Sequence, residues 1–84
     1  MSQKIQITLE AARKNMGYTQ EEAANLFEVH YQTLAKWEKD NSHMSASSIE
    51  KIPRIYHIPK ENIFFGPKNE FIRLKRERSD DVSG

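Results

Sequence analysis

Apolar residues in the first part of the chain recur every three or four positions, which is the spacing of helices that bury one face. Leu9, Ala12 and Met16 are spaced in this way. The helix that they define is expected to end at Gly17, because glycine tolerates the left-handed conformation that often follows a helix. Residues 1–7 lack this spacing, and we expect them to form a short arm.

A second helix is predicted to begin at Thr19, where Thr19-Gln-Glu-Glu22 has the sequence of a capping box. In this motif each end residue accepts a hydrogen bond from a backbone N–H of the other. The small residues Ala23 and Ala24 follow, and small side chains allow two helices to approach closely. We expect this helix to end near Glu28.

A third helix is predicted from about Tyr31 to Lys39. Leu34 and Trp37 lie three positions apart and would face inward, so Trp37 is interpreted as a core residue rather than one that stacks on bases. The first turn is polar, whereas a helix buried for packing would begin with apolar residues. The outward positions carry Gln32, Lys36 and Lys39.

The pattern is less regular after a polar, turn-rich stretch at residues 40–46. Ser47-Ser-Ile-Glu50 has the sequence of a second capping box and would start a fourth helix. We expect Pro53 to kink or interrupt this helix, because a proline in a helix interior removes a backbone hydrogen bond and costs about 3 kcal/mol. A last short helix from Pro59 to Phe64 would give an all-α fold of five short helices around one core.

The remaining residues, 67–84, read as a C-terminal tail that follows a domain of residues 1–66. Residues 75–84 are charged or small and are expected to be disordered. Three apolar residues precede them and are interpreted as a contact for a partner protein or for a second copy of the chain: Phe71, Ile72 and Leu74.

Composition narrows the possible functions. The 84 residues fit one domain, and 13 basic against 12 acidic side chains give a net charge of +1. This near-neutral balance weakens a nucleic-acid interpretation without removing it, because the arrangement of cations on one face matters more than their sum. No apolar run is long enough for a transmembrane helix. No cysteine is present, the three histidines lack metal-ligand spacing, and no catalytic set of residues is recognisable. We therefore expect a cytoplasmic protein that is not an enzyme and that needs no metal or cofactor.

The stretch TQEEAANLFEVHYQTLAKWE resembles the core of the lambda-repressor-like, Cro-type helix-turn-helix proteins, also called the XRE family. The resemblance covers about residues 5–66, and small phage and prophage regulators look most similar. The features that carry it are the opening Thr19-Gln20-Glu21-Glu22, Ala24 at the close helix contact, Val29 after the turn, Leu34 in the core, and the Trp37-Glu38 pair.

The resemblance implies a lambda-repressor-like DNA-binding domain with its helix-turn-helix motif at about residues 19–39. The third helix would lie in the major groove, and a homodimer would contact two half-sites about one turn apart. The implied partner is a double-stranded DNA operator. The implied role is that of a phage or prophage transcriptional regulator, either a repressor or a Cro-like switch protein.

Individual residues match the family's functional positions. Gln32 can pair bidentately with adenine, and Lys36 can donate to guanine. Arg13 and Glu38 match a pair that bridges the first and third helices, and we interpret it as structural. The positions implied to contact bases are His30, Tyr31, Gln32 and Lys36. Those implied to contact phosphates are Gln20, Thr33, Lys39, Asn41 and Ser42.

The chain departs from the family pattern at the turn. Most relatives have glycine where this chain has Glu28, because the residue there is left-handed, and another residue costs about 1–2 kcal/mol. His30 stands where serine or threonine usually caps the third helix, and histidine is a poorer cap.

A second hypothesis from a different class therefore stays open. The chain would be a protein-interaction module on the same fold, binding another regulator as an antirepressor or modulator, with weak or no DNA binding. The near-neutral charge, the glutamate at the turn and the apolar tail residues favour it.

Overall fold

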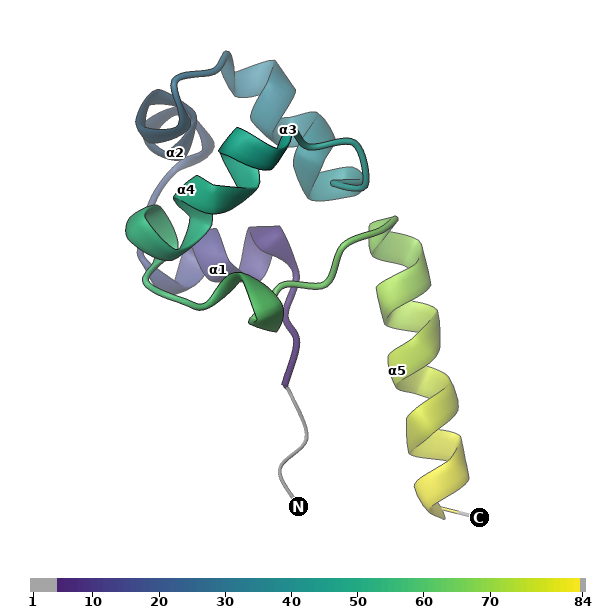
Figure 1. Cartoon of the computed structure of the whole chain (residues 1–84). Helices are drawn as coiled ribbons and strands as arrows, with labels where there is room; N and C mark the ends of the chain where they lie inside the picture. The colour runs from purple at the N-terminus through teal and green to yellow at the C-terminus, as the bar shows by residue number, and fades with distance from the viewer. Residues whose placement is uncertain (1–4, 84) are drawn as a thin grey trace.

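The structure, a computed structural model, describes residues 5–83, with side chains for residues 5–77. It is all-α, as the sequence predicts (Figure 1). The elements in chain order are α1 (Leu9–Asn15), α2 (Gln20–Phe27), α3 (Tyr31–Lys39), α4 (Ala46–Tyr56), a 3-10 turn η1 (Lys60–Asn62) and α5 (Lys68–Ser83). In this described part of the chain, neither α5 nor any shorter helix is long and apolar enough to cross a membrane.

The core lies between α1, α2, α3 and α4. The closest packing is between α2 and α3, where Ala23, Ala24 and Leu34 are almost completely buried. The ring of Trp37 packs edge-on against Phe27, with 5.9 Å between centroids, so its interpretation as a core residue is confirmed. The other core residues are Leu9, Ala12, Met44, Ile52, Ile55, Tyr56 and Ile63.

Side-chain caps define where the first helices begin. The predicted capping box of α2 is confirmed: the Glu22 N–H donates to the Thr19 hydroxyl at 3.1 Å, and the Thr19 N–H donates to the Glu22 carboxylate at 2.8 Å. Thr8 also caps α1, and its hydroxyl accepts from the N–H of Ala11. Gly17 follows α1 with a φ of +76°, as its predicted role requires.

The expected start of α4 was wrong, and the interruption expected as one outcome at Pro53 does not occur. The helix is capped by Ser45, whose hydroxyl accepts from the N–H of Ser48, so it begins ahead of the proposed Ser47–Glu50 capping box. It also continues through Pro53 to Tyr56 without interruption. Pro53 is exposed and lies within the last turn of α4, so its ring points away from the core and few helical bonds remain beyond it.

The expected last helix, from Pro59 to Phe64, is only the 3-10 turn η1, because the chain then becomes extended to pair with the arm. Ile7 forms a parallel bridge with Ile63. The N–H of Ile7 donates to the Asn62 carbonyl at 2.8 Å, and the N–H of Phe64 donates to the Ile7 carbonyl at 2.9 Å. The arm is therefore fixed to the end of the domain from Ile5 onward.

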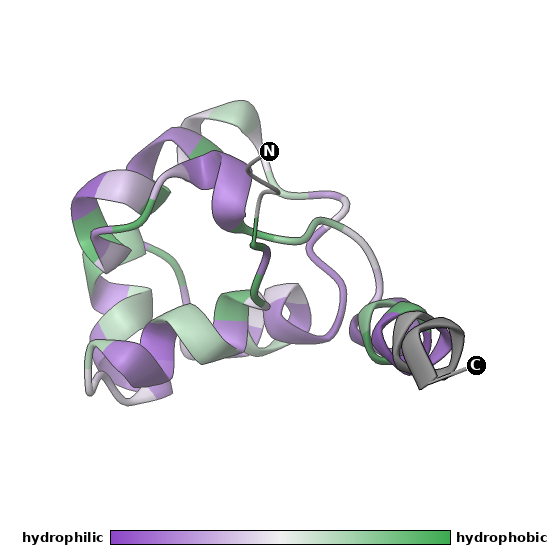
Figure 2. Cartoon of the chain, turned by 90° about the horizontal axis from the view of Figure 1, so that it is seen from below, coloured by the Kyte–Doolittle hydropathy of each residue, from purple (hydrophilic) through white to green (hydrophobic). Residues whose placement is uncertain are grey.

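The tail corrects a further expectation, because residues 68–83 form the helix α5 and are not a disordered segment. Ion pairs support it along one side: the Arg73 guanidinium contacts Glu70 one turn before and Glu77 one turn after. Beyond its first turns α5 stands apart from the other helices, as Figures 1 and 2 show from two directions.

The start of α5 is attached to the domain by an aromatic contact and an ion pair. Phe71 packs on Phe64 with 5.1 Å between ring centroids. The Lys68 ammonium lies 2.6 Å from the Glu10 carboxylate of α1, and this hydrogen bond lowers the pKa of Glu10 below its ordinary value of 4.5.

We expect acidification to loosen this attachment. A carboxylate whose pKa is lowered in the folded state stabilises that state above its ordinary pKa, and the contribution disappears as the pH falls through the lowered value. Amide exchange protection in the first turn of α5 should therefore fall between pH 5 and pH 3 by less than about 1 kcal/mol, since the pair is partly exposed. In Lys68→Met the same acidification should change this protection much less, and an equal loss in both proteins would contradict the assignment.

Candidate nucleic-acid interface

The turn between α2 and α3 is short and sharply defined. Glu28 ends α2 in the left-handed region, with φ 63° and ψ 42°, as expected for this position. The N–H of Val29 donates to the Ala24 carbonyl at 2.9 Å, and Val29 packs against the core. Only three residues therefore separate α2 from α3, and the turn that they form sets the angle between the two helices.

Lys51 explains how a glutamate is accommodated at the turn. Its ammonium donates to the Phe27 carbonyl at 3.3 Å and lies 3.6 Å from the Glu28 carboxylate. It therefore satisfies a carbonyl at the end of α2 and offsets the charge of Glu28. Lys51 could not be found from the sequence alone, because only the fold places the middle of α4 against this turn.

Substitutions at Glu28 should separate backbone strain from charge. Glu28→Gly is expected to raise the free energy of unfolding by about 0.5–1 kcal/mol, because relief of the left-handed strain outweighs the greater freedom of unfolded glycine and a weak surface ion pair. Glu28→Gln keeps the strain and removes only the charge, so it should leave stability within about 0.5 kcal/mol of the native protein. Urea unfolding monitored by Trp37 fluorescence measures both, and a glycine variant less stable than the native chain would contradict this explanation.

The exposed side of α3 carries most of the residues predicted to contact bases, and we call His30, Tyr31, Gln32, Lys36 and Lys39 the recognition face. All five are exposed. The His30 Nδ1 accepts from the N–H of Gln32 at 3.1 Å, so the imidazole serves as the cap of α3. Its ring packs on Tyr31, with 4.7 Å between centroids. This stack fixes the tip of the helix.

Gln20 and Thr33 flank this face. The Gln20 amide nitrogen donates to the Glu38 carboxylate at 2.9 Å, which braces the start of α2 against α3. Gln20 is the first residue of α2, where free backbone N–H groups favour an anion such as a phosphate oxygen. Thr33 is half-buried beside the recognition face.

Two of the residues expected to contact phosphates have their polar groups occupied within the protein. Asn41 is only 3% exposed, and its side chain is bonded to the backbone of Phe64 and Gly66, so this prediction was wrong. Ser42 is exposed, but its hydroxyl donates to the Asp40 carboxylate at 2.6 Å. This bond lowers the pKa of Asp40 and keeps a negative charge next to Ser42, which disfavours a phosphate there.

The predicted structural pair is confirmed in its geometry. The Arg13 guanidinium donates twice to the Glu38 carboxylate, at 2.6 and 3.3 Å, and the side chains are 9% and 5% exposed. A further bond reaches the Tyr18 carbonyl at 2.9 Å. The carboxylate of Glu38 raises the pKa of Arg13. Together with Gln20, the pair connects α1, α2 and α3 behind the recognition face.

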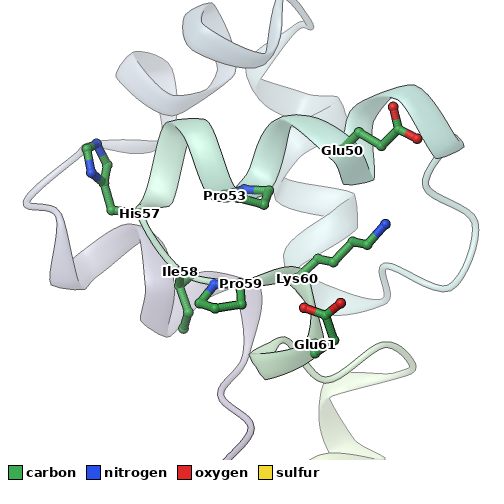
Figure 3. Close-up of a pocket in the computed structure, with 7 residues that line it drawn as sticks. All are labelled: Glu50, Pro53, His57, Ile58, Pro59, Lys60 and Glu61. Atoms are coloured by element: carbon green, nitrogen blue, oxygen red, sulfur yellow. The ribbon is translucent and has the colours of Figure 1, made fainter.

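A groove of 490 Å³ lies elsewhere on the surface, between α4 and the segment that follows it (Figure 3). Pro53, Ile58 and Pro59 form its apolar part, and Glu50, Lys60 and Glu61 lie around it. It includes no residue of α2 or α3 and is separate from the recognition face. Within the described residues, no cluster of histidine and acidic side chains is arranged to hold a metal ion.

Comparison with known proteins identifies the type of domain. A family model described as Helix-turn-helix, which represents lambda-repressor- and Cro-like proteins, matches residues 9–62. The match begins with α1, ends with η1 and leaves α5 outside. A comparison with curated proteins found no match.

Proposed function

The chain belongs to the lambda-repressor- and Cro-like (XRE) helix-turn-helix family, and from this premise we propose that it regulates transcription by binding a specific site in double-stranded DNA. The observation that carries the proposal is the recognition face itself. Five exposed side chains that can hydrogen-bond or stack lie along one short helix and at the cap that precedes it. Behind them the Arg13–Glu38–Gln20 bonds hold that helix rigidly. Such preorganisation is what specific recognition requires.

In the proposed complex α3 lies in the major groove, with its N-terminal turns against the base edges. The amide of Gln32 pairs with the N6 and N7 atoms of an adenine, and the ammonium of Lys36 donates to the O6 and N7 atoms of a guanine. Tyr31 packs on a thymine methyl group or bonds a phosphate. His30, whose Nδ1 caps the helix, can reach the DNA only with the rest of its ring.

Phosphate contacts would come from both helices of the motif. Gln20 and the first N–H groups of α2 bind one phosphate, and Thr33 and Lys39 bind others. Asn41 is not part of this set, because its side chain is buried. Ser42 is exposed, but its hydroxyl is bonded to Asp40, so we do not assign it a phosphate. The proposed contacts include two cations, Lys36 and Lys39, which fits a net charge of +1 and predicts a modest salt dependence.

We also propose that the protein binds DNA as a homodimer formed through α5. Ile72 and Leu74 are 42% and 40% exposed, and Phe71 of the same helix is partly exposed. Exposed apolar side chains on a helix that stands apart from its domain are what a second copy would cover. A phage or prophage repressor or Cro-like switch protein in the bacterial cytoplasm is the role that the resemblance to small phage and prophage regulators favours.

Footprinting on the operator tests this proposal. We expect two protected half-sites about 10–10.5 base pairs apart, one for each copy of the chain.

Changing both Ile72 and Leu74 to glutamate should give a monomer by sedimentation and weaken operator binding by about 100-fold, because avidity is lost. Arg76→Gln, an exposed polar change on the same helix, is the matched control and should behave as the native protein. A protected region of a single half-site in the native protein would contradict the dimer.

A second candidate function follows from the same exposed side chains on α5. The chain would bind another regulator through Phe71, Ile72 and Leu74 and contact DNA weakly or not at all. The glutamate at the turn and the carboxylate of Asp40 near the end of α3 favour this alternative. It predicts that changes on α5 abolish partner binding, whereas changes on the recognition face do little.

A further inference from the structure

The end of α3 and the start of α5 meet at a buried amide. The Asn41 side-chain nitrogen donates to the Phe64 carbonyl at 3.1 Å, and its oxygen accepts from the Gly66 N–H at 2.8 Å. Asn41 is thus bonded to two residues of the connection between η1 and α5, Phe64 and Gly66. We call these three residues the Asn41 joint.

Neighbouring contacts hold the same connection. Asp40, which ends α3, forms an antiparallel bridge with Pro67, which directly precedes α5. Gly66 has a φ of +144°, and a side-chain β-carbon added there would lie 3.1 Å from the ring of Phe64. The connection is therefore closely packed as well as hydrogen-bonded, and the family match ends before it.

We infer that Asn41 is a positioning residue that fixes the angle between α3 and α5, and thereby sets the half-site spacing that a dimer joined through α5 can bind. The inference rests on the proposed function. It replaces the phosphate contact expected for Asn41 with a role inside the protein. This role also explains why the polar side chain of Asn41 is buried here. Apolar packing alone would leave α5 free to change its angle to α3.

A small change of angle at the joint has a large effect on spacing. The nine residues of α3 span about 13 Å from the joint to the recognition tip. With α5 paired to its copy, a swing of about 10° would move each tip by about 2 Å and change the distance between the tips by about 4 Å. One base-pair step is about 3.4 Å, so this change would alter the half-site spacing that the dimer can bind by about one base pair.

Distance measurement in the DNA-free protein tests the joint directly. The chain has no cysteine, so Lys36→Cys and Arg76→Cys introduce two spin labels, one on α3 and one on α5. Dilution with unlabelled protein removes distances between copies. We expect one narrow distance distribution with native Asn41 and a clearly broader one with Asn41→Ala. Ser42→Ala is the matched control, since its hydroxyl bonds only to Asp40 among the described residues, and it should leave the distribution narrow.

Gly66→Ala strains the joint from its other side and provides a second variant should Asn41→Ala fold poorly. A broad distribution in the labelled protein with no change at the joint would overturn the inference. Unchanged distributions in both joint variants would overturn it as well.

Operators with altered spacing supply the functional test. For native protein we expect one inserted or removed base pair between the half-sites to weaken binding by about tenfold, and for Asn41→Ala by only about twofold. Equal weakening at every spacing would mean that Asn41 is merely structural. If the native protein binds no operator, the proposed function is wrong. The spin-label distances would still show whether Asn41 fixes the angle between α3 and α5.

Discussion

Replacing Glu38 with alanine is expected to lower the free energy of unfolding by about 3–5 kcal/mol. The substitution leaves the buried guanidinium of Arg13 without its partner, and an uncompensated buried charge is among the most destabilising changes in a small domain. It also removes the acceptor that braces Gln20. Urea unfolding, followed through the single tryptophan, Trp37, gives the difference.

The matched comparison is a double variant, Arg13→Met with Glu38→Leu. Replacing both members of a buried pair with apolar side chains of similar size often costs little, so this variant should be more stable than Glu38→Ala alone. If Glu38→Ala lowers the free energy of unfolding by less than about 1 kcal/mol, the pair is not the brace that we describe.

The second large effect should appear in DNA binding. Gln32→Ala and Lys36→Ala are each expected to weaken operator binding by about 1–3 kcal/mol, since each removes one of the proposed bidentate base contacts. Gln32→Ala should also relax the preference for one A·T pair. Lys36→Ala should in addition reduce the salt dependence, as it removes a cation from the interface.

Lys60→Ala is the matched control for charge. Lys60 is exposed on η1, beside the groove of α4 and far from the recognition face in the fold. Its replacement removes the same positive charge as Lys36→Ala. It should leave operator binding nearly unchanged. Full operator affinity in both Gln32→Ala and Lys36→Ala would show that the recognition face has been assigned wrongly.

The helix-turn-helix motif could be predicted well because short-range signals determine it. The capping box at Thr19 and the inward spacing of Leu34 and Trp37 involve residues within one or two turns of each other. The left-handed position of Glu28 follows from the resemblance, and the structure confirms it. The structural pair of Arg13 and Glu38 is distant in sequence and was identified only through the resemblance.

The errors arose where tertiary contacts or overlapping local signals decide the structure. Asn41 follows α3 in a polar stretch that resembles an exposed turn, and only the return of the chain near Gly66 buries it. The helix α4 is capped by Ser45 and begins at Ala46, because two serine caps compete within a few residues. For α5 a local signal was present, since Arg73 lies at helical spacing from Glu70 and Glu77. The high charge of the segment outweighed it in the prediction.

The central claim, that the recognition face binds a specific DNA site, is tested most directly by fluorescence anisotropy. The purified protein is titrated into labelled duplexes that tile the DNA flanking its own gene, at two salt concentrations. We expect one duplex to bind at least about 10³-fold more tightly than the rest, and its affinity to fall as salt rises. Weak and uniform binding to every duplex, or no binding at all, would contradict the claim and favour a partner protein bound through α5.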